Sequence, residues 1–432
     1  MSTRVVSVFG LVALTFAACV LVALPAVADS QARIVRLSDV HGSVQIDKNT
    51  GLGFENAFLN LPITQGTQLK TLTDGRVEVE FEDGSSLRLT PNSMIRFSTL
   101  GLSDSGQRIS VIELVEGMAY MNWLGKDEVT LNFSREKISL NRAAHFRLDT
   151  SAEASNVAVF KGDVEVEGPA GKLVVEKRKT ATFDPANDDK STVVAKIVEG
   201  PFDTWDKEAS AYHDQYAKNA NSSPYGYGLS DMNYYGSYTS VPGYGMMWQP
   251  FFTGIGWDPF MNGAWGWYPG YGYMFASAYP WGWLPYRYGN WMFVPGFGWM
   301  WQPGGWSSWL TVPHYTATNL SAVHPPIPPT SVGKTVLVGK APPSSGSGSP
   351  FRTVVRTGSA GMGIARGSIG NLSHLNHEVA KSGFAEVHPA PQFGAVSGSR
   401  SSGYSSAEHS TASAPSVHSS PSSGGHVSSP HH

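Results

Sequence analysis

Residues 75–89 read GRVEVEFEDGSSLRL, and this stretch decides the fold of the first half of the chain. Val77, Val79 and Phe81 alternate with charged residues, which is the period of a strand with one apolar face and one charged face. Residues 86–90 repeat the alternation. Asp83-Gly84 lies between the two runs and indicates a hairpin, because glycine accepts a positive φ. We therefore predict two antiparallel strands whose charged face is solvated.

Similar short runs continue on both sides of this hairpin, separated by glycines about every ten residues. They are residues 109–115, 129–133, 157–160, 164–166 and 173–175. Many short alternating strands with regular turns are typical of an antiparallel sandwich or roll. We predict one such mainly β domain over residues 29–200.

The first 28 residues have the pattern of a secretory signal peptide. Arg4 precedes an apolar run from Val5 to Leu24, and Ala26 and Ala28 fit the small-residue rule of signal peptidase. We predict cleavage before Asp29 and an extracytoplasmic protein, in the periplasm, on the outer surface or secreted. The alternative is an uncleaved membrane anchor, because the run approaches the ~20 residues that span a bilayer.

Residues 201–223 are predicted to form a helix followed by a linker. Trp205, Ala209, Tyr212 and Tyr216 follow the spacing of one helical face. Asp203 or Thr204 is the expected N-cap, and the helix is expected to run from Phe202 to Asn219.

Residues 224–313 contain a threefold repeat rich in Trp, Tyr, Gly and Pro. Its marker is Pro-Gly-aromatic-Gly, which begins at Pro242, Pro269 and Pro295. Proline followed by glycine favours a type II turn, and the flanking aromatic runs have strand propensity. We predict a small β-repeat module of strand–turn–strand units, each stacked on its neighbour.

The tryptophans of this module form the candidate ligand-binding site. Trp257, Trp265, Trp283 and Trp291 recur at equivalent repeat positions. Their indole faces could form an exposed strip that stacks on sugar rings or on a protein partner. The alternative interpretation is that they form the core of the module, because it has few other large apolar residues.

Residues 314–432 are rich in Ser, Pro, Gly and His, and we predict a disordered tail from about Thr330. His374, His377 and His388 lie close together in sequence, and imidazole binds borderline metals. A soluble low-complexity tail is the favoured interpretation, so no metal or other cofactor is predicted.

Composition excludes several classes of function. The 432 residues carry a net charge of −3, which argues against broad binding of nucleic acid, and a single Cys excludes a disulfide framework. No nucleophile, zinc-protease or phosphate-loop motif is present, so no catalytic residue is predicted.

Four stretches of the sequence resemble FecR-type domains. They are residues 75–89, Asn92 to Ile95, 115–119 and 160–164. Residues 280–291, PWGWLPYRYGNW, resemble a Trp/Tyr-rich repeat module that follows such domains in bacterial envelope proteins. The resemblance implies an all-β, non-enzymatic extracytoplasmic domain. Its best-known relatives are iron-uptake regulators that pass a surface signal to a sigma factor. Only four residues precede the apolar run here, and so short a segment cannot hold a sigma factor.

We therefore expect a non-catalytic envelope or surface protein, not an enzyme. The β domain would serve as scaffold, and the aromatic repeats would bind envelope polysaccharide, peptidoglycan or an envelope protein. The alternative is a FecR-like sensor or signal-transduction component, anchored by an uncleaved N-terminal segment. That segment would be the chain's only contact with a membrane.

Overall fold

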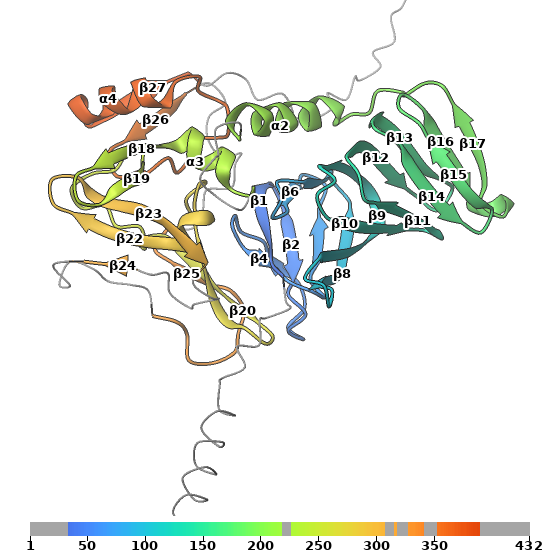
Figure 1. The fold of residues 1–432 in the computed structure, drawn as a ribbon, viewed down its shortest axis with the longest axis horizontal. Coiled ribbons are helices and arrows are strands. Elements are labelled where there is room, and N and C mark those ends of the chain that lie inside the picture. Colours follow the sequence, from blue (N-terminus) through green and yellow to red (C-terminus); the bar gives the residue numbers. More distant parts are fainter. Residues whose placement is uncertain (1–32, 218–225, 307–314, 318–326, 341–351, 389–432) are drawn as a thin grey trace, which may run out of the picture. The chain divides into compact units, whose positions relative to one another are not determined.

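The structure is a computed structural model that describes residues 33–217, 226–306, 315–317, 327–340 and 352–388. This part of the chain is mainly β, as predicted (Figure 1). The predicted signal peptide, 1–28, lies outside the described residues, as does the end of the predicted tail from residue 389.

Seventeen strands form the β domain, and η1 (Pro185–Asn187) is a short 3₁₀ turn before the last of them. The strands are β1 (Val35–His41), β2 (Val44–Asp47), β3 (Glu55–Asn56), β4 (Pro62–Ile63), β5 (Gln68–Thr71), β6 (Arg76–Glu80), β7 (Ser86–Leu89), β8 (Met94–Leu102), β9 (Arg108–Trp123), β10 (Glu128–Phe133), β11 (Glu136–Leu140), β12 (Ala144–Thr150), β13 (Ser155–Lys161), β14 (Val164–Gly168), β15 (Gly171–Val175), β16 (Thr180–Asp184) and β17 (Lys190–Val194).

The predicted hairpin is present as β6 and β7, which pair antiparallel around Asp83-Gly84. Gly84 has a φ of 90°, and the Asp83 carboxylate accepts the backbone N–H of Ser85 at 2.8 Å. Val77 and Val79 point into the core and are fully buried. Burial of each such side chain contributes about 1.5–3 kcal/mol. The apolar face of the hairpin therefore builds the core, as its alternation predicts.

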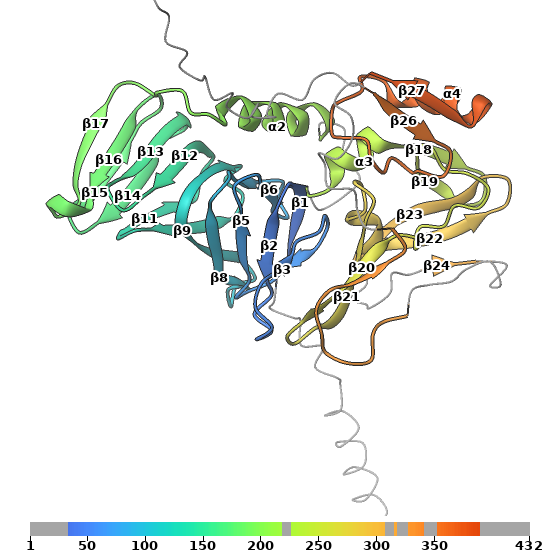
Figure 2. The same cartoon turned by 180° about the vertical axis from the view of Figure 1, so that it is seen from behind.

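Strand β9 joins the two sheets of this domain (Figure 2). Its first half pairs with β8 and β10, and its second half pairs with β7 and β12. The change of sheet occurs at Gly117, whose φ is 88°. Because β9 turns from one sheet to the other, β10 returns to run parallel to its beginning. This parallel pair is the exception in an otherwise antiparallel sandwich.

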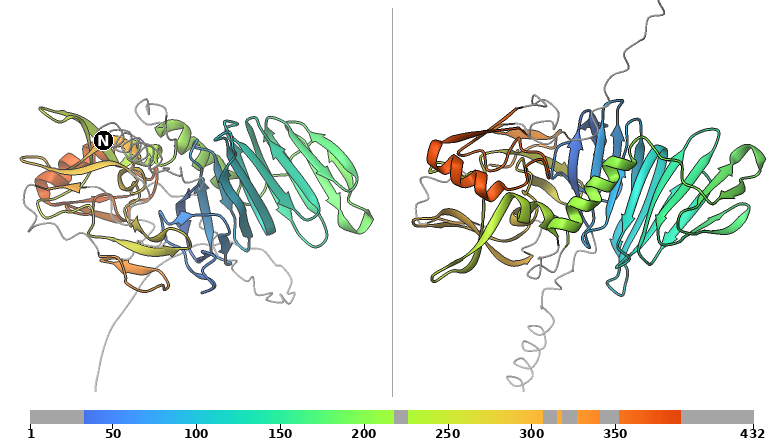
Figure 3. Two further views of the ribbon diagram at one scale, coloured as in Figure 1. Left: turned by 60° about the horizontal axis from the view of Figure 1, so that its bottom comes forward. Right: turned by 90° about the horizontal axis from the view of Figure 1, so that it is seen from above.

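Helix α2 (Asp203–Tyr216) lies across strands of the β domain (Figure 3). It confirms the helix predicted between the two modules, and Trp205 and Tyr212 on its predicted stripe are buried. The predicted cap is wrong. Phe202 occupies the N-cap position, and the Asp203 carboxylate instead accepts the backbone N–H of Gly200 at 2.9 Å.

The aromatic module contains three hairpins, one for each predicted repeat. They are β18 (Gly236–Val241) with β19 (Gly245–Pro250), β20 (Gly263–Tyr268) with β21 (Gly272–Ser277), and β22 (Tyr288–Val294) with β23 (Gly298–Trp306). Each turn contains Pro-Gly, and the glycines have φ near 80°. Helix α3 (Leu229–Tyr235) precedes the first hairpin, and η2 (Leu284–Tyr286) the third.

The hairpins do not stack in chain order as predicted. The first and third share one sheet through a β19–β23 contact, and β24 (Tyr315–Thr316) extends that sheet beside β22. The second hairpin pairs with β25 (Val336–Val338). The module therefore extends beyond the predicted boundary at 313.

The prediction of disorder from 314 to 432 is wrong for the described residues of that region. Strands β26 (Thr353–Arg356) and β27 (Phe384–Val387) pair, and α4 (Leu372–Ser382) lies between them in sequence. Leu372, Leu375 and Val379 occupy one face of α4 and are buried in the aromatic core. These few apolar residues suffice because they fill a surface that the aromatic side chains already provide.

Gly117 provides a test of the sheet change in β9. A Cβ at this position would lie 2.3 Å from Ser93 Oγ and 2.6 Å from Asn92 O, in addition to the positive φ. We expect Gly117→Ala to lower the free energy of unfolding by roughly 2–4 kcal/mol. Gly106 has a similar φ of 78° but open space around it, so Gly106→Ala should cost only about 1 kcal/mol. Urea denaturation measures both, and equal losses would contradict this role of Gly117.

Candidate functional site

The outer, charged face of β6 and its neighbours is buried, which contradicts the predicted solvated face. Arg36 on β1 and Arg88 on β7 are 0% exposed, and Glu78 and Glu80 on β6 are 1% exposed. Side chains of α2, α3 and the segment around Arg366 cover them. We call the resulting set the junction cluster, which comprises Arg36, Glu78, Glu80, Arg88, Asp206, His213, Asp231 and Arg366.

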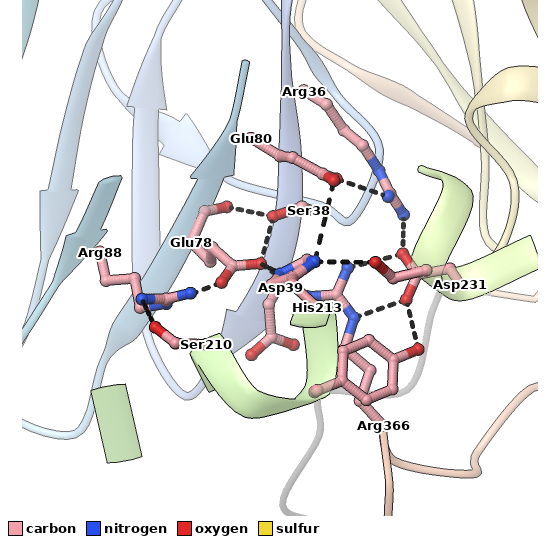
Figure 4. Close-up of polar contacts among 12 residues, drawn as sticks. Arg36, Ser38, Asp39, Glu78, Glu80, Arg88, Ser210, His213, Asp231 and Arg366 are labelled. Atoms are coloured by element: carbon pink, nitrogen blue, oxygen red, sulfur yellow. Dashed lines mark hydrogen bonds and ion pairs between the residues drawn. The ribbon is translucent and has the colours of Figure 1, made fainter. Parts of the chain in front are cut away.

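Glu78 lies at the centre of the junction cluster (Figure 4). Its Oε2 accepts Arg88 Nε at 2.7 Å. Its Oε1 accepts Arg366 Nη1 at 2.8 Å and lies 3.0 Å from His213 Nε2. The Ser38 hydroxyl also donates to Oε1 at 2.8 Å. One carboxylate of the β domain thus binds a strand, a helix and a distant segment of the chain.

Asp231 on α3 is the corresponding carboxylate of the aromatic module. Arg366 binds it through two nitrogens, Nε to Oδ1 at 2.8 Å and Nη2 to Oδ2 at 2.6 Å. Arg36 Nη2 reaches Oδ2 at 2.6 Å, and the Tyr212 hydroxyl donates to Oδ1 at 2.9 Å. Bidentate arginine–carboxylate pairs fix orientation as well as distance. Arg36 and Arg366 therefore connect α3 directly to the sheet of β1 and β6.

Helix α2 is connected to the same face through Asp206. Its Oδ1 accepts Arg88 Nη1 at 2.7 Å, and its Oδ2 lies 2.7 Å from His145 Nε2. Arg88 Nη1 also donates to the Ser210 hydroxyl at 3.0 Å. These contacts explain why a helix with a weakly apolar stripe is held on a charged sheet.

The electrostatics of the cluster favour ion pairs for most of its members. Burial opposes ionisation of Glu78, but His213, Arg88 and Arg366 outweigh it and hold the pKa of its carboxyl well below the ordinary value. The pKa of Asp231 is lowered for the same reason, chiefly by Arg366 and Arg36 against burial. Burial raises the pKa of Glu80 in spite of nearby His213 and Arg36.

Chemically, this arrangement is suited to holding segments together. Each carboxylate of the cluster lies within 4 Å of two or more basic side chains. A general acid or base needs a proton that it can exchange with a substrate, whereas these carboxylates are already held by cations. The alternation Val–Glu–Val–Glu marks these positions in the sequence, but nothing in it shows that a second layer covers them.

The four predicted site residues do not form an exposed strip. Trp257 is 5% exposed, Trp265 and Trp283 are 1% exposed, and Trp291 is 0% exposed. Trp257 packs edge-on against Trp291, with ring centroids 5.8 Å apart. The expectation of exposed indoles is wrong, and the alternative, that they form the core of the module, describes their position. The module has few aliphatic residues, so its largest rings must fill its interior.

Different aromatic residues reach the surface at the hairpin turns. Tyr244, Tyr271 and Phe297 occupy the third position of the three Pro-Gly-aromatic-Gly turns. Phe297 is 46% exposed, and the two tyrosines are half-buried. Gln302 Nε2 donates to Tyr244 O at 3.0 Å, and Gln249 Nε2 donates to Phe297 O at 2.8 Å, which fixes two of the turns. The repeat in the sequence could have identified these three residues, because it places them in turns and turn residues project from the sheet.

The clustered histidines of the predicted tail have protein partners. His374 Nδ1 lies 3.4 Å from Glu378, and His377 Nδ1 lies 2.7 Å from Ser373 O on the same helix, α4. Within the described ranges, no three His, Cys, Asp or Glu side chains are grouped so that they could hold a metal. In the same ranges, no helix has the length and apolar character required to cross a membrane.

Comparison with known proteins identifies two domains in the order that the sequence suggested. Residues 67–165 match the FecR protein family, and residues 229–330 match a family of unknown function, DUF6600. The chain thus carries a FecR-type domain followed by an uncharacterised module. Among curated proteins, none matches the chain significantly.

Two solved structures show a limited similarity to part of this chain. Both are described as "a putative anti-sigma factor" from Parabacteroides distasonis, and each is 18% identical to this chain with a TM-score of 0.28. The matched region covers 34% of this chain and 72% and 71% of the other two.

Arg366 provides a direct test of the junction cluster. Arg366→Met removes the cation shared by Glu78 and Asp231 and leaves two buried carboxylates short of a partner. We expect the free energy of unfolding to fall by about 3–5 kcal/mol in urea denaturation. Arg352, whose ion pair with Glu386 is largely exposed, is the control, and Arg352→Met should cost at most about 0.5 kcal/mol. Equal effects of the two variants would show that the cluster does not hold the segment.

His213 makes the stability of the cluster depend on pH. Burial opposes its charge, but Glu78 and Glu80 outweigh burial and raise the pKa of the imidazole. The raised pKa means that the stabilisation is complete below the unfolded value of about 6.5 and disappears as the pH rises through the folded value. We expect the melting temperature of wild type to exceed that of His213→Gln at pH 5.5 and this difference to shrink at alkaline pH. His374→Gln, on the surface of α4, should show no such trend, and a difference independent of pH would contradict the assignment.

Proposed function

We propose that the protein is a non-catalytic, extracytoplasmic binding and scaffold protein. The observation that carries this proposal is the position of one aromatic residue at each of three equivalent turns, where Phe297 is exposed and Tyr244 and Tyr271 are partly exposed. Partly exposed aromatic side chains on rigid supports are typical of binding surfaces. The FecR-type domain supports the non-enzymatic part of the proposal, because the resemblance implies a domain without catalysis.

The junction cluster supports the role of scaffold. It connects the FecR-type domain to α3, which leads directly into the first hairpin of the aromatic module. Ion pairs of 2.6–3.0 Å between buried groups restrict the relative orientation of these elements. A preorganised support reduces the entropy lost when a partner binds.

The placement of the turns favours an extended ligand. Strands β19 and β23 run antiparallel, with Trp248 opposite Trp301. The first and third turns therefore lie at opposite ends of the sheet that they share. Rings separated in this way suit a repeating polymer, so we place envelope polysaccharide or peptidoglycan before a protein partner.

Cosedimentation with purified peptidoglycan and retardation on polysaccharide gels test this proposal. The triple variant Tyr244→Ala/Tyr271→Ala/Phe297→Ala should lose at least about tenfold in affinity, because stacking of each ring contributes about 0.5–1.5 kcal/mol. Val174 and Val193 are 50% and 39% exposed on the FecR-type domain, and Val174→Ala/Val193→Ala is the matched control. Equal binding by wild type and the triple variant, or no binding by wild type, would refute a glycan ligand.

A second candidate function is that of a FecR-like signalling component, and the family match over residues 67–165 favours it. Such a component would require an N-terminal segment that stays in the membrane. Mass spectrometry of the protein isolated from its native cells distinguishes the two. An N-terminus at Asp29 favours the scaffold, and an intact Met1 end favours the signalling component.

A further inference from the structure

A small hollow lies at one end of the β domain, between its edge strands β15 and β17, and is separate from the aromatic turns. The hollow has a volume of about 70 Å³. Its lining includes Glu136, Asp189 and Ser191, together with Gly168, Ala170 and Gly171 of the turn between β14 and β15. This volume has room for several water molecules or for a hydrated ion.

Two carboxylates in this hollow are buried with an unpartnered oxygen. Glu136 is 3% exposed, and its Oε1 has no hydrogen-bond partner, whereas Oε2 accepts the backbone N–H of Arg135 at 3.2 Å. Asp189 is 1% exposed, and its Oδ1 likewise has no hydrogen-bond partner. Leaving a buried charged oxygen unsatisfied is costly. Both residues line the hollow, so a species bound there could satisfy these oxygens.

The charged side chains around the hollow favour a positively charged ligand. Glu136 and Asp189 line the same hollow, so two negatively charged groups face one small space. Arg135 Nη2 lies 2.6 Å from Asp189 Oδ2, and Lys172 at the rim is bound to Glu165 at 3.0 Å. These cations leave Glu136 Oε1 and Asp189 Oδ1 without a positive partner. A cation between the two oxygens would remove the repulsion.

The backbone leaves space for this contact. The β14–β15 turn has glycine at both ends, where Gly168 pairs with Gly171. A Cβ on Gly168 would lie 3.1 Å from Cγ of Glu136 and 3.6 Å from its Oε1. The Glu136 carboxylate therefore lies directly over the turn.

We propose that this hollow is a Ca²⁺ site formed by Glu136, Asp189 and oxygens of the surrounding backbone and Ser191. Ca²⁺ accepts six to eight oxygen ligands in flexible geometry and takes many of them from carbonyls and water, so two carboxylates suffice. Mg²⁺ demands a stricter octahedron and is a poorer match for an irregular hollow of this kind. With so few charges the affinity should be weak, in the range of about 0.1–1 mM that extracellular calcium modules show.

Thermal unfolding of the full chain, with CaCl₂ as the probe, tests the site. Calcium at about 10 mM, ten times the weakest expected dissociation constant, should raise the melting temperature by roughly 3 °C. Glu136→Gln and Asp189→Asn should each abolish this shift. Glu136→Gln should melt no lower than wild type without calcium, because it removes one of two repelling charges. A variant that retains its fold but loses the response therefore separates binding from structural damage.

Glu153→Gln is the matched control, since Glu153 is an exposed carboxylate of the same domain, and it should keep the full calcium shift. Isothermal titration of wild type and Glu136→Gln provides a second measurement, in which only wild type should bind. The absence of any calcium response in wild type would overturn the proposal. So would a shift that persists in both site variants, or an equal shift with MgCl₂.

Discussion

Glu78 is a buried carboxylate on a strand face that other elements cover, and the arrangement of those elements follows from this one charge. It can stay charged only because Arg88, Arg366 and His213 surround it. Each of these comes from a different part of the chain, so satisfying Glu78 requires β7, α2 and the segment around residue 366 to be in place together. Buried ion pairs contribute little net stability compared with apolar packing, but breaking one is costly. The cluster therefore selects one arrangement of the chain rather than adding to its stability.

The β domain was predictable because its information is local. Alternation of Val and Leu with charged residues, and glycines at the turns, specify strands and hairpins without reference to the rest of the chain. The same alternation wrongly predicted that Glu78, Glu80 and Arg88 are exposed. A charged strand face in solvent and one covered by oppositely charged side chains have the same pattern in the sequence. What covers that face, Asp231 and Arg366, lies 153 and 288 residues away from Glu78, too far for any pattern to connect.

In the aromatic module, the turns were predictable from the sequence but the buried side chains were not. The repeat predicted its three hairpins and their turns, because Pro-Gly restricts the backbone directly. It could not show which rings are buried, since the aromatic runs do not alternate with charged residues that would mark a solvent side. Trp265 and Trp291 lie in the core because the module contains little else with which to fill its interior. The turn residues lie at the surface because a hairpin turn projects from its sheet. The apparently disordered tail was misjudged for a related reason, as α4 needs only three apolar residues when a large aromatic surface is available to receive them.

The bond between Arg366 and Glu78 also has a consequence for the order in which the protein can mature. A ribosome releases the β domain before it releases residue 366. During that interval Glu78 and Asp231 lack the cation that they share, and the layer over β6 is incomplete. The sheet of β1 and β6 is thus covered only after residue 366 has been made, and a product truncated before that residue leaves Glu78 and Asp231 without the cation that they share.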